Sequence, residues 1–120
     1  MTLRQRKGDQ PLPQTGQIDV GPEVLKEVDL ASRSNVVFAA VRRDFEERIT
    51  LGVERYGHPL QTNNGRDAGL DAYQELLDAA HYLKQLELET HSSRVRLAYW
   101  SVLDLVFDIR EWLGVAPPCT

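Results

Sequence analysis

The acidic side chains of one stretch of the sequence have a spacing that could hold a metal ion. Between residues 64 and 83 the chain carries carboxylates at relative positions i, i+4, i+8 and i+11. At 3.6 residues per turn, these positions return to nearly the same azimuth of a helix and form one acidic stripe. Mg2+ prefers oxygen ligands, and carboxylates one turn apart suit an ion that also binds a phosphate. The carboxylates are Asp67, Asp71, Glu75 and Asp78.

Part of this stripe has a purely structural explanation. Like charges at i, i+4 disfavour an isolated helix, but the helix dipole favours acidic residues in the first turn. The dipole accounts for Asp67 and partly for Asp71, and it leaves Glu75 and Asp78 to be explained. Asn64 followed by Asp67 also predicts an N-cap arrangement, which makes Asp67 the weakest metal candidate. A solvated acidic face is therefore the alternative to a metal site.

Apolar residues at helical spacing predict the elements that must position these carboxylates. Gly57 and Pro59 break one such pattern, and a short link around Ser92 makes the last two helices antiparallel. On the central helix an apolar band lies on a different side from the acidic stripe, and it is predicted to be buried. The band is Tyr73, Leu76, Leu77, Ala80 and Leu83, and helices are predicted at about residues 23–30, 34–55, 64–89 and 93–113.

The last predicted helix has more apolar surface than one neighbouring helix can cover. Trp100, Leu103, Phe107 and Trp112 widen its apolar row. A three-helix monomer would not readily hide this area, which favours pairing with a second copy. The predicted fold is therefore all-α: an antiparallel helical bundle of three to four helices, completed by oligomerisation as a homodimer or homotetramer.

Length, charge and cysteine content argue against several classes of function. The 120 residues suffice for one domain, and the net charge of −4, with 14 basic and 18 acidic residues, argues against binding to nucleic acid. We expect no membrane association, because the sequence has neither a spanning apolar run nor a signal-peptide pattern. The single cysteine, Cys119, allows no internal disulfide, so the predicted location is the cytoplasm.

Glycines and prolines divide the chain into three predicted parts. The first twenty residues combine Gly8, Pro11, Pro13 and Gly16 with polar residues and have no sustained apolar period, which predicts flexibility. Proline near the C-terminus prevents the last helix from continuing. The predicted parts are a flexible N-terminal arm at 1–20, a helical domain at 21–114 and a C-terminal tail at 115–120.

Several segments together resemble a known family of enzymes. An acidic pair, Glu46-Glu47, is followed by the local sequences at 55–60, 64–67 and 71–78 and by Tyr82-Leu83. This pattern is similar to the MazG-like all-alpha nucleoside triphosphate pyrophosphohydrolases, and in particular to a small phage-type branch of that superfamily. The match spans about residues 42–86, within the predicted helical domain.

The resemblance implies a helical bundle that oligomerises and binds Mg2+, with Mn2+ as the alternative ion. The family builds its site from Glu-Glu-x-x-Glu on one helix and Glu-x-x-Asp on the next. This sequence departs from the pattern at the third position of the first element, which is Thr50, although Glu54 or Asp71 could supply the missing charge. The metal ligands that the resemblance implies are Glu46, Glu47, Asp71, Glu75 and Asp78.

The implied reaction is hydrolysis of a nucleoside or deoxynucleoside triphosphate to its monophosphate and pyrophosphate. Glu47 is the expected catalytic residue, because a carboxylate there could orient or deprotonate the attacking water. The expected substrate-binding residues are Arg55, Arg66 and Lys84, which would offset charge on the leaving pyrophosphate, and Tyr82, which could stack on the nucleobase.

Thr50 keeps a second interpretation open. A neutral hydroxyl cannot replace a carboxylate charge, so the chain could be a non-catalytic helical oligomer that binds nucleotide or a protein partner. A bundle with a purely structural role is a third interpretation. It predicts that neutral replacements of Glu75 and Asp78 raise stability by relieving repulsion.

Overall fold

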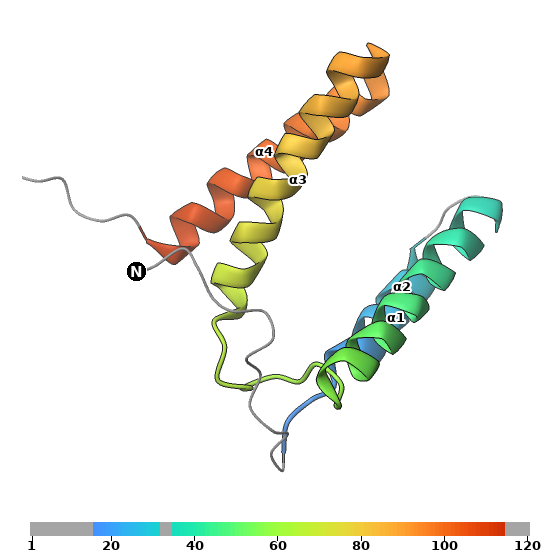
Figure 1. Cartoon of the computed structure of the whole chain (residues 1–120), viewed down its shortest axis with the longest axis vertical. Helices are drawn as coiled ribbons and strands as arrows, with labels where there is room; N and C mark the ends of the chain where they lie inside the picture. The colour runs from blue at the N-terminus through green and yellow to red at the C-terminus, as the bar shows by residue number, and fades with distance from the viewer. Residues whose placement is uncertain (1–15, 32–34, 115–120) are drawn as a thin grey trace, which may run out of the picture. The chain divides into compact units, whose positions relative to one another are not determined.

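The computed structural model describes residues 16–31 and 35–114, and in this part of the chain it contains helices and no strand (Figure 1). The predicted all-α fold is therefore confirmed. The chain divides into two compact units, one that holds α1 and α2 and one that holds α3 and α4, and each is described by itself. No helix among the described residues is long and apolar enough to cross a membrane. The helices are α1 (Val20–Leu30), α2 (Asn35–Tyr56), α3 (Ala68–Thr90) and α4 (Ser93–Leu113).

In the first unit, α1 and α2 lie side by side and run antiparallel (Figure 1). Near the end of α1, Asp29 is bound by Arg42, and near its start Gly21 packs against Ile49. A Cβ atom added to Gly21 would lie 3.0 Å from Cγ1 of Ile49, so the glycine allows a close approach of the two helices. Helix α1 begins three residues before the predicted start because Pro22 falls in its first turn, where a missing N–H is tolerated.

The residues before α1 pair with the loop that follows α2. The backbone N–H of Val20 donates to the carbonyl of Leu60 (2.9 Å), and the N–H of Thr62 donates to the carbonyl of Ile18 (2.9 Å). The side-chain amide of Gln17 adds two bonds of 2.7 Å, to the carbonyls of Thr62 and Asn63. The predicted flexible arm therefore ends earlier than residue 20, because its last residues are tied to this loop. Residues 1–15 of the arm and the predicted tail at 115–120 lie outside the described residues.

Both ends of α3 are capped. Asp67 is the N-cap residue, and its Oδ1 accepts a bond of 3.0 Å from the N–H of Leu70. The prediction that Asn64 caps this helix is wrong: its Oδ1 accepts from the N–H of Arg66 (3.0 Å) in a turn that leads to the helix. Gly65 in that turn has φ of 82°, which a helix cannot contain, so α3 starts four residues later than predicted.

A two-residue link joins α3 to α4 and makes them antiparallel, as predicted (Figure 1). His91 takes the left-handed conformation (φ 55°), and its N–H bonds to the carbonyl of Glu87 (2.7 Å). Ser92 then caps α4 by accepting a bond of 3.3 Å from the N–H of Val95. The bounds predicted for α4 are confirmed.

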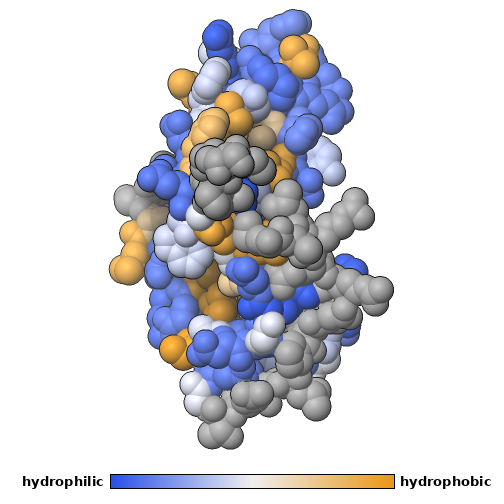
Figure 2. All heavy atoms as spheres, turned by 90° about the vertical axis from the view of Figure 1, so that its left-hand side faces the viewer, coloured by the Kyte–Doolittle hydropathy of each residue, from blue (hydrophilic) through white to orange (hydrophobic). Residues whose placement is uncertain are grey.

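The contact between α3 and α4 contains the buried residues. Among the described residues, Leu70 (4% exposed) and Ala80 (8% exposed) are the buried apolar side chains. The predicted apolar band of α3 is confirmed on the side of the core, with Tyr73, Leu76, Leu77 and Leu83 half-buried around Ala80. Large apolar side chains also remain at the surface of both units, and Figure 2 shows hydrophobic residues interspersed with hydrophilic ones.

Candidate functional site

The acidic residues of α3 share one face of the helix, as the sequence spacing predicts. Asp71, Glu75 and Asp78 lie within about 60° of one another at 100° per residue. Asp71 is half-buried in the first turn, and Glu75 and Asp78 are exposed. Asp67 precedes the helix and serves as its cap, so the stripe within the helix has three carboxylates rather than four.

This acidic face points away from α4. The opposite side of α3 carries Gly69, where an added Cβ would lie 3.0 Å from a ring carbon of Trp112, and Tyr73, whose ring lies 5.8 Å from the guanidinium of Arg110. The acidic face of α3 is therefore turned away from the α3–α4 contact. Tyr82 lies one turn beyond Asp78 on the acidic face and is 69% exposed, so its ring is accessible for stacking.

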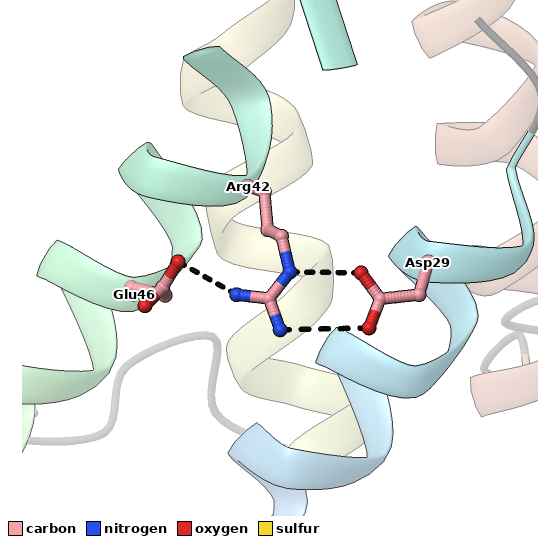
Figure 3. Close-up of polar contacts among 3 residues, drawn as sticks. All are labelled: Asp29, Arg42 and Glu46. Carbon is pink, nitrogen blue, oxygen red and sulfur yellow. Dashed lines mark hydrogen bonds and ion pairs between the residues drawn. The ribbon is translucent and has the colours of Figure 1, made fainter. Parts of the chain in front are cut away.

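The predicted metal ligand Glu46 has another partner on α2. Its Oε1 accepts a hydrogen bond of 2.6 Å from Nη1 of Arg42, one turn earlier (Figure 3). The same guanidinium binds Asp29 of α1 through Nε (2.8 Å) and Nη2 (3.5 Å). Hydrogen bonds from Arg42 to Asp29 and then to Glu46 raise the pKa of this arginine above its ordinary value. One oxygen of Glu46 is therefore already bound by Arg42, and the positive charge of Arg42 opposes the approach of a cation.

Glu47 lies in a different environment from its neighbour. It lines a shallow hollow on the exposed side of α2 and, among the described residues, has no ion-pair partner. The hollow combines carboxylates with one guanidinium, and Thr50, which is exposed, also lines it. Its lining residues are Arg43, Glu46, Glu47, Thr50, Leu51 and Glu54.

The predicted phosphate-binding residues are distributed over different surfaces. The guanidinium of Arg55 lies 5.5 Å from the ring centre of Tyr56 and lines a second hollow with Glu54. Arg66 is half-buried in the loop before α3. Lys84 binds Glu87 (2.8 Å) and lies 4.5 Å from the ring centre of Tyr99 on α4. Lys84 therefore lies on the core side of α3, and the α3–α4 pair does not bring it to the acidic face.

The donor set of α3 fits a cation that keeps several waters. Among residues 16–31 and 35–114, no three His, Cys, Asp or Glu side chains converge on one point. Mg2+ is commonly held by one or two carboxylates, with waters and substrate phosphates as the other ligands. Glu75 and Asp78, three residues apart on one face, match that requirement for two carboxylates. These two carboxylates do not form a site in which every metal ligand comes from the protein.

One basic residue beside the acidic side chains was missed by the sequence reasoning. Arg43 lines the hollow on α2 and lies one turn before Glu47. An Arg four residues before a Glu places both on one face of a helix, and that spacing was the available signal. A mostly apolar groove of about 300 Å3 lies between α1, α2 and the 58–60 loop, and it contains none of the predicted site residues.

Comparisons with protein-family models, with curated protein sequences and with solved structures found no match to this chain. The geometry of the two helical units and the sequence pattern are therefore the observations on which a function can be argued.

Proposed function

We propose that this protein hydrolyses a nucleoside or deoxynucleoside triphosphate to its monophosphate and pyrophosphate, in the cytoplasm, at a site that includes the acidic face of α3. The observation that carries the proposal is the run of Asp71, Glu75 and Asp78 on a face turned away from the packing contact with α4. Like charges one turn apart disfavour an isolated helix, and a bound cation would relieve that repulsion. The resemblance to MazG-like enzymes supports the same assignment.

Glu75 and Asp78 would hold Mg2+ or Mn2+, with Asp71 one turn away as a further ligand. When bound, such an ion lowers the pKa of a bound water and neutralises phosphate charge. Because the two carboxylates leave most coordination positions to water and phosphate, the donor set is suited to a triphosphate substrate. Tyr82, exposed beyond Asp78, would stack on the base.

The carboxylate proposed as the general base is Glu47. It is exposed and has no ion-pair partner in the described part of the chain, so it can accept a proton from a water. Arg43 and Arg55 on the same helix, together with Arg66, would offset the charge of the leaving pyrophosphate. Glu46 is a secondary ligand in this proposal, because one of its oxygens is bound by Arg42.

The test is pyrophosphate release by the full chain over a panel of NTPs and dNTPs, with and without Mg2+. We expect Asp78→Asn and Glu75→Gln to lower the rate by at least about 100-fold, since a metal supplies several kcal/mol of transition-state stabilisation. Glu89→Gln, an exposed carboxylate near the end of the same helix, is the matched control and should retain activity. No release from any nucleotide by the wild type would overturn the proposal.

A second candidate function is nucleotide binding without turnover by a helical oligomer. The ion pair between Arg42 and Glu46 favours it, because it withdraws one carboxylate from the acidic set that already lacks a charge at Thr50. Calorimetry distinguishes the two functions: this candidate predicts that nucleotide binds and is recovered intact. For either function we propose a homodimer or homotetramer, because large apolar side chains of α2 and α4 are exposed in the single chain.

A further inference from the structure

Helix α4 carries an apolar seam that α3 does not cover. Trp100 is 54% exposed and Phe107 is 71% exposed, and Leu103 lies half-buried between them. The spacings of three and four residues place these side chains in a line along the helix, as in the seam of a helix that packs against one partner helix. The side of α4 that contacts α3 is a different one, marked by Tyr99 beside Lys84 and by Arg110 beside Tyr73. Within the α3–α4 pair, Trp100 and Phe107 therefore keep more than half of their surface exposed, and Leu103 is partly covered.

The charges beside the seam are separated along α4. Arg96 lies before it in the N-terminal half of the helix, and Asp104 and Glu111 lie beside it in the C-terminal half, where Arg110 is on the side of α3. The order of Arg96 and Glu111 opposes the helix dipole, which favours acidic residues at the start of a helix and basic residues at its end, whereas Arg110 in the last turn agrees with it. Within the α3–α4 pair, Nε of Arg96 lies 4.0 Å from Oε1 of Glu87, and the side chain of Arg96 is mostly exposed. The separation of charge along α4 is thus not explained by the helix itself.

Antiparallel pairing of two copies of α4 would match both patterns at once. Trp100 and Phe107 lie at equal separations from the midpoint between Leu103 and Asp104, and Arg96 and Glu111 are likewise symmetric about it. A two-fold axis at this midpoint places Trp100 opposite Phe107 of the partner subunit. The same axis places Arg96 opposite Glu111 of the partner subunit, and every pair occurs twice because the interface is self-complementary.

We propose that the α4 seam is the surface on which a second copy of this chain docks, with the two α4 helices antiparallel about this two-fold axis. A parallel arrangement would place Arg96 beside Arg96 and Glu111 beside Glu111, so the charges select the antiparallel one. The aromatic residues at the centre supply contact area, as Trp does in many interfaces. The proposal does not rest on hydrolysis, because the seam is separate from the acidic face of α3.

The experiment measures the dimer dissociation constant of the full chain by sedimentation equilibrium over a range of protein concentrations. Arg96→Glu and Glu111→Arg should each raise Kd by about tenfold or more, because each places like charges opposite one another twice. The combined variant, Arg96→Glu with Glu111→Arg, should restore Kd to near the wild-type value. Circular dichroism of each variant verifies that its helices are formed at the concentrations used.

Arg94→Glu is the matched control, because Arg94 carries the same charge on the same helix but lies away from the seam. Its Kd should equal that of the wild type. A wild type that stays monomeric at every concentration would overturn the proposal, and another part of the same chain would then be the occupant of the seam. A dimer that none of the seam variants weakens, or a combined variant that stays dissociated, would also overturn it.

Discussion

The two helical pairs of this chain are held together by different kinds of interaction. No residue of α1 or α2 is buried. That pair is joined by the ion pair between Arg42 and Asp29, by the close approach of Gly21 to Ile49 and by hydrogen bonds between residues 17–20 and the 60–63 loop. The α3–α4 pair buries Leu70 and Ala80 and has side-chain caps at the start of each helix. The first pair therefore leaves more of its contacts accessible to water, and the second removes more apolar surface from water.

This difference indicates which part of the chain can stand alone. Short helices are marginal in water unless an apolar face is covered, and α2 leaves Val37, Val41 and Phe45 partly exposed. We therefore expect the α3–α4 pair to contribute most of the free energy of unfolding. The α1–α2 pair should depend more strongly on further contacts that cover its apolar side chains. The following substitutions test that contrast.

The largest effect is expected for Leu70→Ala. Leu70 is the most buried side chain in the described part of the chain, and its truncation should lower the free energy of unfolding by about 2–3 kcal/mol. Leu88→Ala, at an exposed position of the same helix, should change it by less than about 0.5 kcal/mol. Urea titration followed by circular dichroism measures both. Equal effects of the two substitutions would contradict a core centred on Leu70.

A smaller effect is expected for the cap of α3. Asp67→Ala removes the acceptor for the N–H of Leu70 and should lower the free energy of unfolding by about 1 kcal/mol. Asp67→Asn keeps an oxygen acceptor and should retain most of that stability. If both variants lose the same amount, the charge of Asp67 matters more than its hydrogen bond.

A local effect is expected where the chain pairs before α1. Thr62→Ala removes the hydroxyl that accepts from the N–H of Ile18 at 3.0 Å, at a net cost of about 0.5–1 kcal/mol. Faster hydrogen exchange should be confined to the amides of Ile18 and Val20, while α3 and α4 keep their protection. Thr62→Ser preserves the hydroxyl and should exchange like the wild type. Faster exchange throughout α3 would show that the two pairs unfold together.

The smallest effect is expected for Arg42→Gln, because exposed ion pairs contribute little and are screened by salt. The last turn of α1 should fray, and the change in melting temperature should shrink as salt is added. Because the pKa of Arg42 is raised in the folded state, its contribution is present throughout the neutral range and is lost only as the pH rises through that raised pKa. Arg42→Lys keeps the positive charge, but its ammonium group should no longer bind Asp29 and Glu46 at the same time.

Much of the fold could be predicted because each long helix has a strong apolar period and clear stop signals. The bounds of α4 follow from Ser92 before it and Gly114 after it. The start of α3 was misplaced because Asn64 and Asp67 are both good caps, and only the positive φ of Gly65 decides between them. The pairing of residues 17–20 with the 60–63 loop was missed, since backbone hydrogen bonds between distant segments leave no local pattern.

The candidate site could be predicted only in part. The common face of Asp71, Glu75 and Asp78 follows from helical periodicity alone. The different environments of Glu46 and Glu47 do not follow from periodicity. Glu46 is bound by Arg42, and Arg42 is held by Asp29 on another helix. Lys84 was assigned to phosphate binding on charge alone, and its contact with Tyr99 depends on how α4 packs.

The hydrogen bonds between Ile18 and Thr62 bring the entrance and exit of the α1–α2 segment next to each other. Because the two ends of this segment are adjacent, inserting it into another chain would not separate the residues that flank it. Joining residues 18 and 62 by a short linker should therefore give a circular peptide with the same backbone path, and the segment could be transplanted into a surface turn of an unrelated host without forcing that turn apart.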